Sequence, residues 1–292
     1  MIITNLKGGL GNQMFQYAAG LSLSIDKNTT HKVETEHFRN NTDFKKETER
    51  VFELDFFNTK YEIASKEEIL SIKYPYPLIS KALVLMNSYL LAHNYIKLPL
   101  TLNKRSKDIY LDGYFQSENY FKKYSEKIRE EFTLNSKLLT KDFNHILKLI
   151  NESNGKSTSL HLRRGDYITN IHANKHHGVL ENSYYINAIE LIKKRTQDIK
   201  LFVFSDDIEW VKKNLDFLDK SSIFVSEFKF NSAQEITLMS KCQNNIIANS
   251  SFSWWGAWLN QNKEKTVIAP KNWLKNGDGR QKDIVPSSWA RI

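Results

Sequence analysis

Hydrophobic and polar positions follow a regular order in the second half of the chain, where short apolar runs alternate with longer amphipathic segments. The runs are rich in β-branched and aromatic residues, which is typical of buried strands. They occupy residues 157–162, 200–205, 221–226, 244–249 and 266–270. Segments with apolar residues at helical spacing lie between them, at 182–195, 207–218 and 232–242. Strand and helix in this rhythm predict a parallel sheet with helices on its faces.

The first half of the chain begins in the same way. A strand-like run, "MIITNL", leads through a glycine turn into "NQMFQYAAGLSLSI", whose apolar positions recur at helical spacing. The pattern weakens after residue 35, and the segment "NESNGKST" then joins a helical stretch to the next strong strand. We therefore predict an α/β protein with two lobes, 1–152 and 153–292, and a cleft between them.

The charge balance favours an anionic partner. The 292 residues include 42 Lys and Arg against 33 Asp and Glu, which gives a net charge of +9. The lysines are scattered and form no nucleic-acid signature, so we expect a phosphorylated small molecule or an acidic membrane surface and no nucleic acid. A single cysteine, Cys242, excludes an intramolecular disulfide, and its apolar surroundings predict a packing role.

No targeting or membrane-spanning segment is predicted. The N-terminus lacks a basic region followed by a long apolar core, so we expect the protein in the cytosol. The most apolar segment, 78–96, is interrupted by polar residues such as Lys81 and Asn87. It is predicted to be a buried or surface-docked helix.

The ligand site is expected at the carboxyl ends of the strands, because ligands of open parallel sheets bind there. Four loops at such positions are unusual in composition: "KGGLGNQ", "RRGDY", "SDD" and "NSSFSWWGAW".

Glycines in the first of these loops allow a close approach of backbone to ligand, followed by a helix N-terminus that suits a phosphate. An ordinary glycine turn is the alternative. Gly9, Gly11 and Met14 occupy the three glycine places of a dinucleotide fingerprint, so the last glycine of that motif is missing.

The adjacent Arg163 and Arg164 repel each other unless an anion lies beside them. A structural pair with Asp166 is one interpretation. The other is a bidentate grip on a diphosphate. His161, on the same strand, is placed to reach a base or ribose, although a lone histidine is more often a satisfied polar group.

The serines and tryptophans of "NSSFSWWGAWL" fall at a strand-to-helix turn, where hydroxyl and N–H groups suit an N-cap or a phosphate equally well. Trp254, Trp255 and Trp258 favour core packing over a sugar or base platform.

The acidic residues near these loops have alternative roles, in ligand or metal binding or in the structure alone. Glu235, on an otherwise apolar helix, matches the two adjacent N–H donors of guanine, or forms a surface salt bridge. Asp206 and Asp207 lack metal-ligand spacing and a nearby histidine pair, so we predict no catalytic metal.

Taken together, "GGLGNQMFQYA" (8–18), "HLRRGDY" (161–167), "FSDD" (204–207) and "NSSFSWWGAWL" (249–259) resemble the α-1,2-fucosyltransferases of glycosyltransferase family 11. The resemblance spans nearly the whole chain. It implies a GT-B-type fold of two Rossmann-like lobes facing a central cleft. It also implies GDP-β-L-fucose as donor, inversion, transfer to O2 of a terminal galactose, and neither cofactor nor metal.

The resemblance also assigns residues. Arg163 is the expected grip on the donor diphosphate with Arg164 in support, and His161 and Glu235 are expected to read guanosine. The phosphate-facing turn corresponds to Ser250, Ser251 and Phe252. The N-terminal loop that closes over the donor, and that is expected to help orient the acceptor hydroxyl, corresponds to Gly11 and Asn12.

Asp166 is the candidate general base that takes the acceptor proton. The alternative is a loose transition state that needs little assistance from a base. The lobe 1–152 is expected to face the acceptor, and 153–292 to hold the donor. The acceptor is expected to be a bacterial surface glycan or oligosaccharide, and the basic surface suits peripheral contact with the inner membrane.

The residues alone also allow two other classes of protein. A nucleotide-dependent oxidoreductase of the NAD(P) type would use the glycines but leaves the arginine pair unexplained. A non-catalytic glycan-binding protein would use the tryptophans without needing the arginines.

Overall fold

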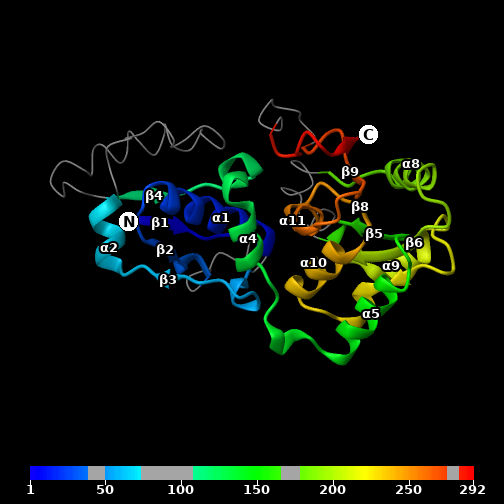
Figure 1. Ribbon diagram of the computed structural model, residues 1–292, viewed down its shortest axis with the longest axis horizontal. Coiled ribbons are helices and arrows are strands. Elements are labelled where there is room, and N and C mark those ends of the chain that lie inside the picture. Colours follow the sequence, from blue (N-terminus) through cyan, green and yellow to red (C-terminus); the bar gives the residue numbers. More distant parts are fainter. Residues whose placement is uncertain (39–49, 74–107, 166–177, 275–282) are drawn as a thin grey trace. The chain divides into compact units, whose positions relative to one another are not determined.

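The computed structural model describes residues 1–38, 50–73, 108–165, 178–274 and 283–292. The chain divides into two compact units: unit 1 comprises 1–54 and 59–132, and unit 2 comprises 55–58 and 133–292. Each unit contains one parallel sheet (Figure 1). The predicted α/β class, with two parallel-sheet units as in the GT-B type, is confirmed.

The division of the chain falls between residues 132 and 133, whereas the sequence analysis placed it between 152 and 153. Helix α5 (Lys141–Asn151) accounts for the difference, because it packs against α10 (Ser232–Lys241) of unit 2. Its buried face consists of Phe143, Ile146 and Ile150.

Unit 1 has a four-stranded sheet in the order β3-β2-β1-β4. Its strands are β1 (Ile2–Asn5), β2 (His31–Glu34), β3 (Glu62–Ile63) and β4 (Ile109–Leu111). Its α-helices are α1 (Leu10–Asp26), α2 (Lys66–Lys73) and α4 (Ser125–Glu131), with short 3-10 turns η1 (Glu36–Phe38), η2 (Leu54–Phe56), η3 (Glu118–Tyr120) and η4 (Lys122–Tyr124).

Helix α1 lies unusually close to β1 and β2. A Cβ atom on Gly20 would be only 2.0 Å from Thr4 Oγ1 and 2.4 Å from His31 Nε2, so this position requires glycine. The helix and the strands are thereby held in close contact. The glycine-rich loop at the start of α1 is consequently fixed to the carboxyl end of β1.

A buried carboxylate, that of Glu131, lies at the end of unit 1, just before the chain passes to unit 2. Glu131 accepts hydrogen bonds from the Tyr17 hydroxyl at 2.8 Å and from the Lys60 N–H at 2.6 Å, and it pairs with Lys127 at 3.2 Å. These partners satisfy an otherwise costly buried charge.

Unit 2 has a six-stranded parallel sheet in the order β10-β9-β8-β5-β6-β7. Its strands are β5 (Ser157–Leu162), β6 (Lys200–Ser205), β7 (Ile223–Phe224), β8 (Asn244–Ile246), β9 (Val267–Ala269) and β10 (Ala290–Arg291). Besides α5 and α10, its helices are α8 (Asn182–Lys193), α9 (Ile208–Asn214) and α11 (Ser251–Leu259), with 3-10 turns η5 (Ser136–Leu138) and η6 (Val225–Phe228).

Strands β5 and β6 coincide with the predicted runs 157–162 and 200–205. The predicted run 221–226 forms only the two-residue β7, followed by η6. The ladder stops there because the Ser226 side chain accepts the Ser205 N–H at 3.0 Å, in place of a backbone carbonyl.

The core of unit 2 surrounds β5, all of whose residues are buried. The predicted packing role of the tryptophans is confirmed, since Trp254 and Trp255 are fully buried and the Trp254 indole donates to the Ile284 carbonyl at 2.7 Å. Asn245 joins β5, β8 and α10, because its Nδ2 donates to Ser159 Oγ and to the Met239 carbonyl, each at 2.8 Å.

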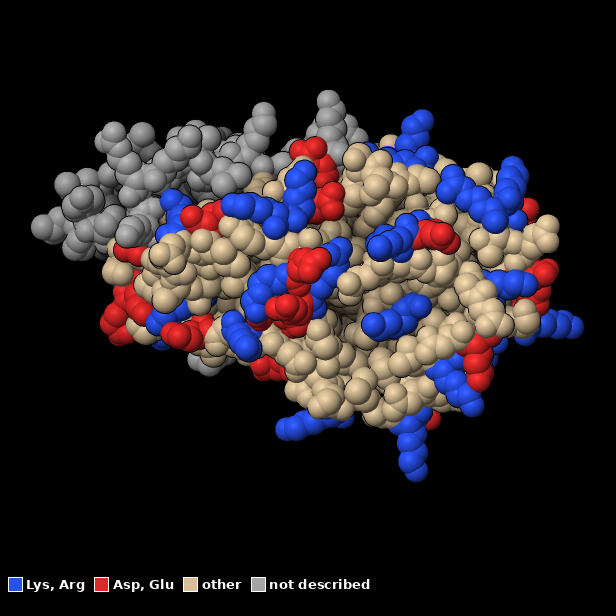
Figure 2. Space-filling view, viewed as in Figure 1, with Lys and Arg blue, Asp and Glu red and all other residues tan. Residues whose placement is uncertain are grey.

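The described helices include none long and apolar enough to cross a membrane. The predicted helix at 78–96 lies outside the described residues. On the face shown in Figure 2, Lys and Arg side chains are interspersed with Asp and Glu rather than gathered in one patch.

The contact between α10 and α11 yields a stability prediction. A Cβ atom on Gly256 would lie 2.8 Å from Met239 Cβ, so Gly256→Ala should overpack the interface between these helices. We expect the variant to lower the free energy of unfolding by about 1–3 kcal/mol, even though alanine is the better helix former. Urea denaturation measures this, and an unchanged midpoint would contradict the close packing.

Candidate functional site

The predicted site residues of unit 2 meet at the carboxyl end of its sheet. Strand β5 lies between β6 and β8. The chain proceeds from β5 to β6 and β7 on one side and returns to β8 on the other, which makes this edge a topological switch point. The loops after β5 and β8 therefore lie on either side of one expected ligand position, in line with the prediction from the sequence.

The arginine pair is anchored by Asp206. Arg163 Nη1 lies 3.1 Å from Asp206 Oδ2, and the backbone N–H of Arg164 donates to Asp206 Oδ1 at 2.9 Å. Both carboxylate oxygens thus serve the residues that follow β5. The "SDD" segment, assessed in the sequence only as a metal-binding acidic pair, has a different role here: it supplies the countercharge of the arginines.

Gly165 is required by this arrangement. A Cβ atom at this position would lie 2.8 Å from Asp206 Oδ2 and 3.1 Å from Asp206 Cγ. Any larger residue would push the carboxylate away from the arginines. The glycine of "RRGD" is therefore explained by the approach of an acid from the neighbouring strand.

Arg164 is held from the side of α9. Its guanidinium carbon lies 3.1 Å from the centroid of the Trp210 ring, and its Nε lies 4.0 Å from Asp207 Oδ2. Asp207 also caps α9 by accepting the Trp210 N–H at 3.4 Å. Trp210 was missed by the sequence analysis. The available signal was an aromatic residue one turn after the acidic pair.

His161 is buried beside Phe252, and the two ring centroids are 5.3 Å apart. Burial lowers the pKa of His161 to about 3; Asp206 opposes this shift and Arg163 adds to it. The imidazole is therefore neutral at physiological pH. Within the described residues, its Nδ1 atom has no hydrogen-bond partner.

Glu235 lies on the first turn of α10. Burial raises the pKa of its carboxyl to about 7, a hydrogen bond with Ser226 counteracts the shift, and the nearby Asp206 charge adds to it. Of the two readings from the sequence, an exposed salt bridge is not what the described residues show, since no ion pair of Glu235 occurs among them. The carboxyl is instead poised to change its protonation near neutral pH.

The turn after β8 leads into α11 as predicted. Ser250 Oγ accepts the Phe252 N–H at 3.3 Å, so Ser250 is the N-cap of this helix. Ser251 and Phe252 form its first turn and are partly exposed. The N-terminus of α11 thus faces the same sheet edge as the arginine pair.

The other predicted residues lie elsewhere in the chain. Gly11 and Asn12 belong to the first turn of α1 in unit 1, where Asn12 Oδ1 accepts a hydrogen bond from Gln116 Nε2 at 2.8 Å. The preceding Gly8 has a φ of +78°, which favours glycine. The predicted base, Asp166, lies outside the described residues.

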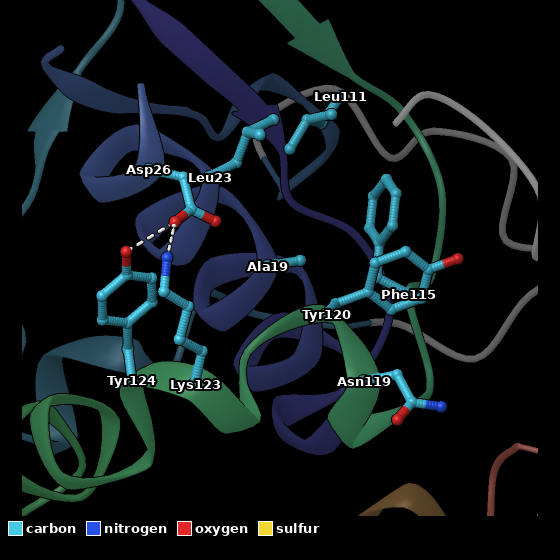
Figure 3. Close-up of a pocket in the computed structure, with 9 residues that line it drawn as sticks. All are labelled: Ala19, Leu23, Asp26, Leu111, Phe115, Asn119, Tyr120, Lys123 and Tyr124. Carbon is cyan, nitrogen blue, oxygen red and sulfur yellow. Dashed lines mark hydrogen bonds and ion pairs between the residues drawn. The ribbon is translucent and has the colours of Figure 1, made fainter. Parts of the chain in front are cut away.

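A cavity of about 170 Å³ lies in unit 1 between α1 and the turns η3 and η4 (Figure 3). Its floor is apolar, with Ala19 and Leu23 from the helix, and Asp26 at its rim accepts hydrogen bonds from Lys123 and Tyr124. None of the predicted site residues lines it. The described part of the chain also holds no group of three or more His, Cys, Asp or Glu side chains suited to a metal ion.

Comparison with known proteins gives a consistent picture. The glycosyl transferase family 11 model matches residues 1–292. An alpha-1,2-colitosyltransferase of Escherichia coli is 36% identical, covering 100% of this chain and 99% of its own. The O-antigen biosynthesis glycosyltransferase WbnK of Escherichia coli is 37% identical over 98% of this chain and 99% of its own.

Similarity extends to more distant proteins. A galactoside alpha-(1,2)-fucosyltransferase 1 of Lagothrix lagotricha is 27% identical over 51% of this chain and 42% of its own. Among solved structures, fucosyltransferase NodZ from Bradyrhizobium superimposes with a TM-score of 0.49 at 12% identity, covering 88% of this chain and 92% of that chain.

Proposed function

The chain belongs to glycosyl transferase family 11, and we propose that it transfers a 6-deoxy-L-hexosyl group from a GDP-activated donor to O2 of a galactose. The product is an α-1,2 linkage formed with inversion, and the donor is GDP-β-L-fucose. The site in unit 2 is the proposed donor site.

The observation that carries this proposal is the arginine pair held by Asp206 at the switch point of the sheet. As the bond from C1 to the diphosphate oxygen breaks, negative charge develops on the departing nucleotide. A guanidinium fixed in advance stabilises that charge without reorganisation. Such a group does the work that a divalent metal does in other nucleotide-sugar enzymes.

Glu235 and His161 support a guanine at the other end of the donor. A carboxylate can accept from the two adjacent N–H groups of guanine, and Glu235 has the burial that makes such a contact selective. The buried Nδ1 of His161 has no partner among the described residues, and a bound nucleotide would supply one.

A second donor is favoured by one comparison. The 36% identical relative is named as an alpha-1,2-colitosyltransferase, and colitose is the 3-deoxy analogue of L-fucose. With either donor, GDP would be the leaving group, and the same negative charge would develop on its diphosphate as the bond to C1 breaks. GDP-colitose is therefore our second candidate donor, distinguished from GDP-fucose by one hydroxyl group.

The acceptor is proposed to be a galactose-containing surface glycan of a bacterium, in line with the O-antigen role in the name of a 37% identical relative. Inversion requires a single displacement in which a base takes the proton of O2. Asp166 stays the predicted base.

The function is tested by transfer assays in excess chelator with GDP-fucose, GDP-colitose and UDP-galactose as donors. Lactose serves as acceptor, with lactose lacking the galactose O2 as the matched control. We expect transfer from a GDP-sugar only, an α-anomeric product by NMR, and no product with the 2-deoxy control. Transfer from UDP-galactose alone, or onto the control acceptor, would refute the proposal.

Arg163→Ala should lower kcat by about 10²–10³ through loss of leaving-group stabilisation. The control is Lys212→Ala, which removes a cation of the same unit that pairs with Glu227 on the surface. Circular dichroism confirms folding of both variants. Activity close to the parent in a folded Arg163→Ala protein would remove Arg163 from the proposed role.

The proposed contact between Glu235 and guanine predicts that GDP binding depends on pH. The guanine N–H groups favour the ionised carboxyl, whereas the protonated form predominates below its pKa of about 7. GDP affinity should therefore be about tenfold weaker at pH 6 than at pH 8. Calorimetry of the parent and Glu235→Gln isolates the effect, because titration of the diphosphate is common to both. An identical pH dependence in the two proteins would exclude Glu235 from guanine recognition.

A further inference from the structure

Ser226 lies beside the carboxyl end of β6, just beyond the end of β7. The register pairs Val203 with Phe224, so continuing it by two residues would place Ser226 opposite Ser205. The backbone instead turns into η6, and Ser226 Oγ accepts the Ser205 N–H at 3.0 Å. A side chain thus takes the place of the ladder at the sheet edge that holds the arginine pair.

The Ser226 hydroxyl has a second partner, the Glu235 carboxyl on the first turn of α10. The oxygen of the hydroxyl is the acceptor for the Ser205 N–H, so its single proton is left to donate to the carboxylate, which can only accept. Among the described residues, the Glu235 carboxyl makes no other hydrogen bond. Its orientation therefore depends on Ser226, and its other lone pairs are left for a ligand.

This link also reaches the segment that anchors the arginines. Ser205 directly precedes Asp206, and its own hydroxyl accepts the Asp207 N–H at 3.1 Å. Ser226 therefore joins the acid proposed to bind guanine to the segment that faces the diphosphate. Two ends of the proposed nucleotide site are connected by one serine.

The groups around Glu235 make this hydrogen bond decisive. Burial raises the pKa of the carboxyl to about 7, the Ser226 hydroxyl opposes the shift, and the Asp206 charge adds to it. In η6, Glu227 pairs with Lys212, and α11 has no ionisable side chain. The ionisable side chains of η5 and α5 are exposed, and they are Lys137, Lys141, Asp142, His145 and Lys148. The Ser226 hydroxyl thus favours the ionised carboxyl against both burial and a like charge.

We propose that Ser226 is a positioning residue of the nucleotide site, whose hydroxyl holds the Glu235 carboxylate in the orientation that receives the two N–H donors of guanine. The assignment rests on the proposed function, since it extends the guanine contact described there. Ser226 acts through Glu235. The alternative is a structural role alone, in which the serine only ends the ladder between β6 and β7.

The experiment measures the affinity for GDP of the full-length parent and of Ser226→Ala by calorimetry, from about pH 6 to about pH 8.5. Without the hydroxyl the ionised carboxyl loses a hydrogen bond, so the pKa of Glu235 rises further. Because the guanine contact requires the ionised form, the midpoint of the pH dependence should move to higher pH by about one unit. At pH 7 the affinity should fall about fivefold, and it should recover towards the upper end of the range.

Conservative variants separate the hydroxyl from the fold. Ser226→Thr keeps the hydroxyl and should keep the parent midpoint. Ser226→Cys is close in size but is a weak donor, so it should move the midpoint in the same direction as alanine and provides the test if Ser226→Ala does not fold.

The matched control is Ser240→Ala, since Ser240 also lies on α10 but donates to the Thr237 carbonyl at 2.7 Å. This variant should keep the parent midpoint. In a Glu235→Gln background, Ser226→Ala should leave the pH dependence unchanged, because no carboxyl is left to titrate there.

Each failure has a distinct signature. Absence of GDP binding to the parent refutes the proposed function and this assignment with it. The same pH dependence in the parent and in Glu235→Gln removes the guanine contact and therefore the role of Ser226. If these two differ but the midpoint is unchanged in Ser226→Ala and Ser226→Cys, the positioning role alone is refuted. Equal weakening at every pH with a lower melting temperature would show that Ser226 only ends the ladder, and would also overturn it.

Discussion

The candidate site of unit 2 depends on one carboxylate placed against two adjacent cations. The register of β5 and β6 pairs Leu162 with Ser205, so the next residues, Arg163 and Asp206, leave the sheet side by side. Asp206 then uses one oxygen for the Arg163 side chain and the other for the Arg164 backbone. Without this countercharge two guanidiniums at the end of a buried strand would repel each other. Gly165 is the steric condition for it, because only glycine admits the carboxylate so closely.

The same carboxylate influences the neighbouring titratable groups. Its charge favours the protonated forms of both His161 and Glu235, but desolvation decides each outcome. His161 is left neutral and Glu235 is left near half protonation at neutral pH. The charges of Arg163 and Arg164 are balanced by Asp206 and Asp207, whereas His161 carries no charge and Glu235 only part of one at neutral pH. A diphosphate approaching this edge meets cations whose orientation is already fixed, which is the electrostatic preorganisation that a departing nucleotide requires.

The sequence predicted the elements that bear the site but not the contacts that complete it. Residues 200–205 were recognisable as a strand because buried parallel strands are nearly continuous apolar runs, and 157–162 because it is a short run with leucines that alternates with helix-like segments. The loops after them followed from the rule for ligand positions. The partnership of Arg163 with Asp206 was not accessible, because it depends on the register between strands that are far apart in the chain. The sequence could not place α5 in either unit for a similar reason: its amphipathic pattern shows that one face is buried but not which helix covers it.

The switch points of the two sheets share one feature of topology but differ in the side chains that their loops supply. In each unit a strand is flanked by an earlier and a later neighbour, and the loops at its carboxyl end hold an ion pair. In unit 2 Asp206 pairs with the Arg163 guanidinium and Asp207 lies 4.0 Å from Arg164 Nε, so two carboxylates hold two cations in fixed positions. In unit 1 a single carboxylate, Asp112, pairs with Lys7 and also accepts a hydrogen bond from Asn5. The two edges therefore differ in the charged groups that their loops supply, although the two sheets share this feature of topology.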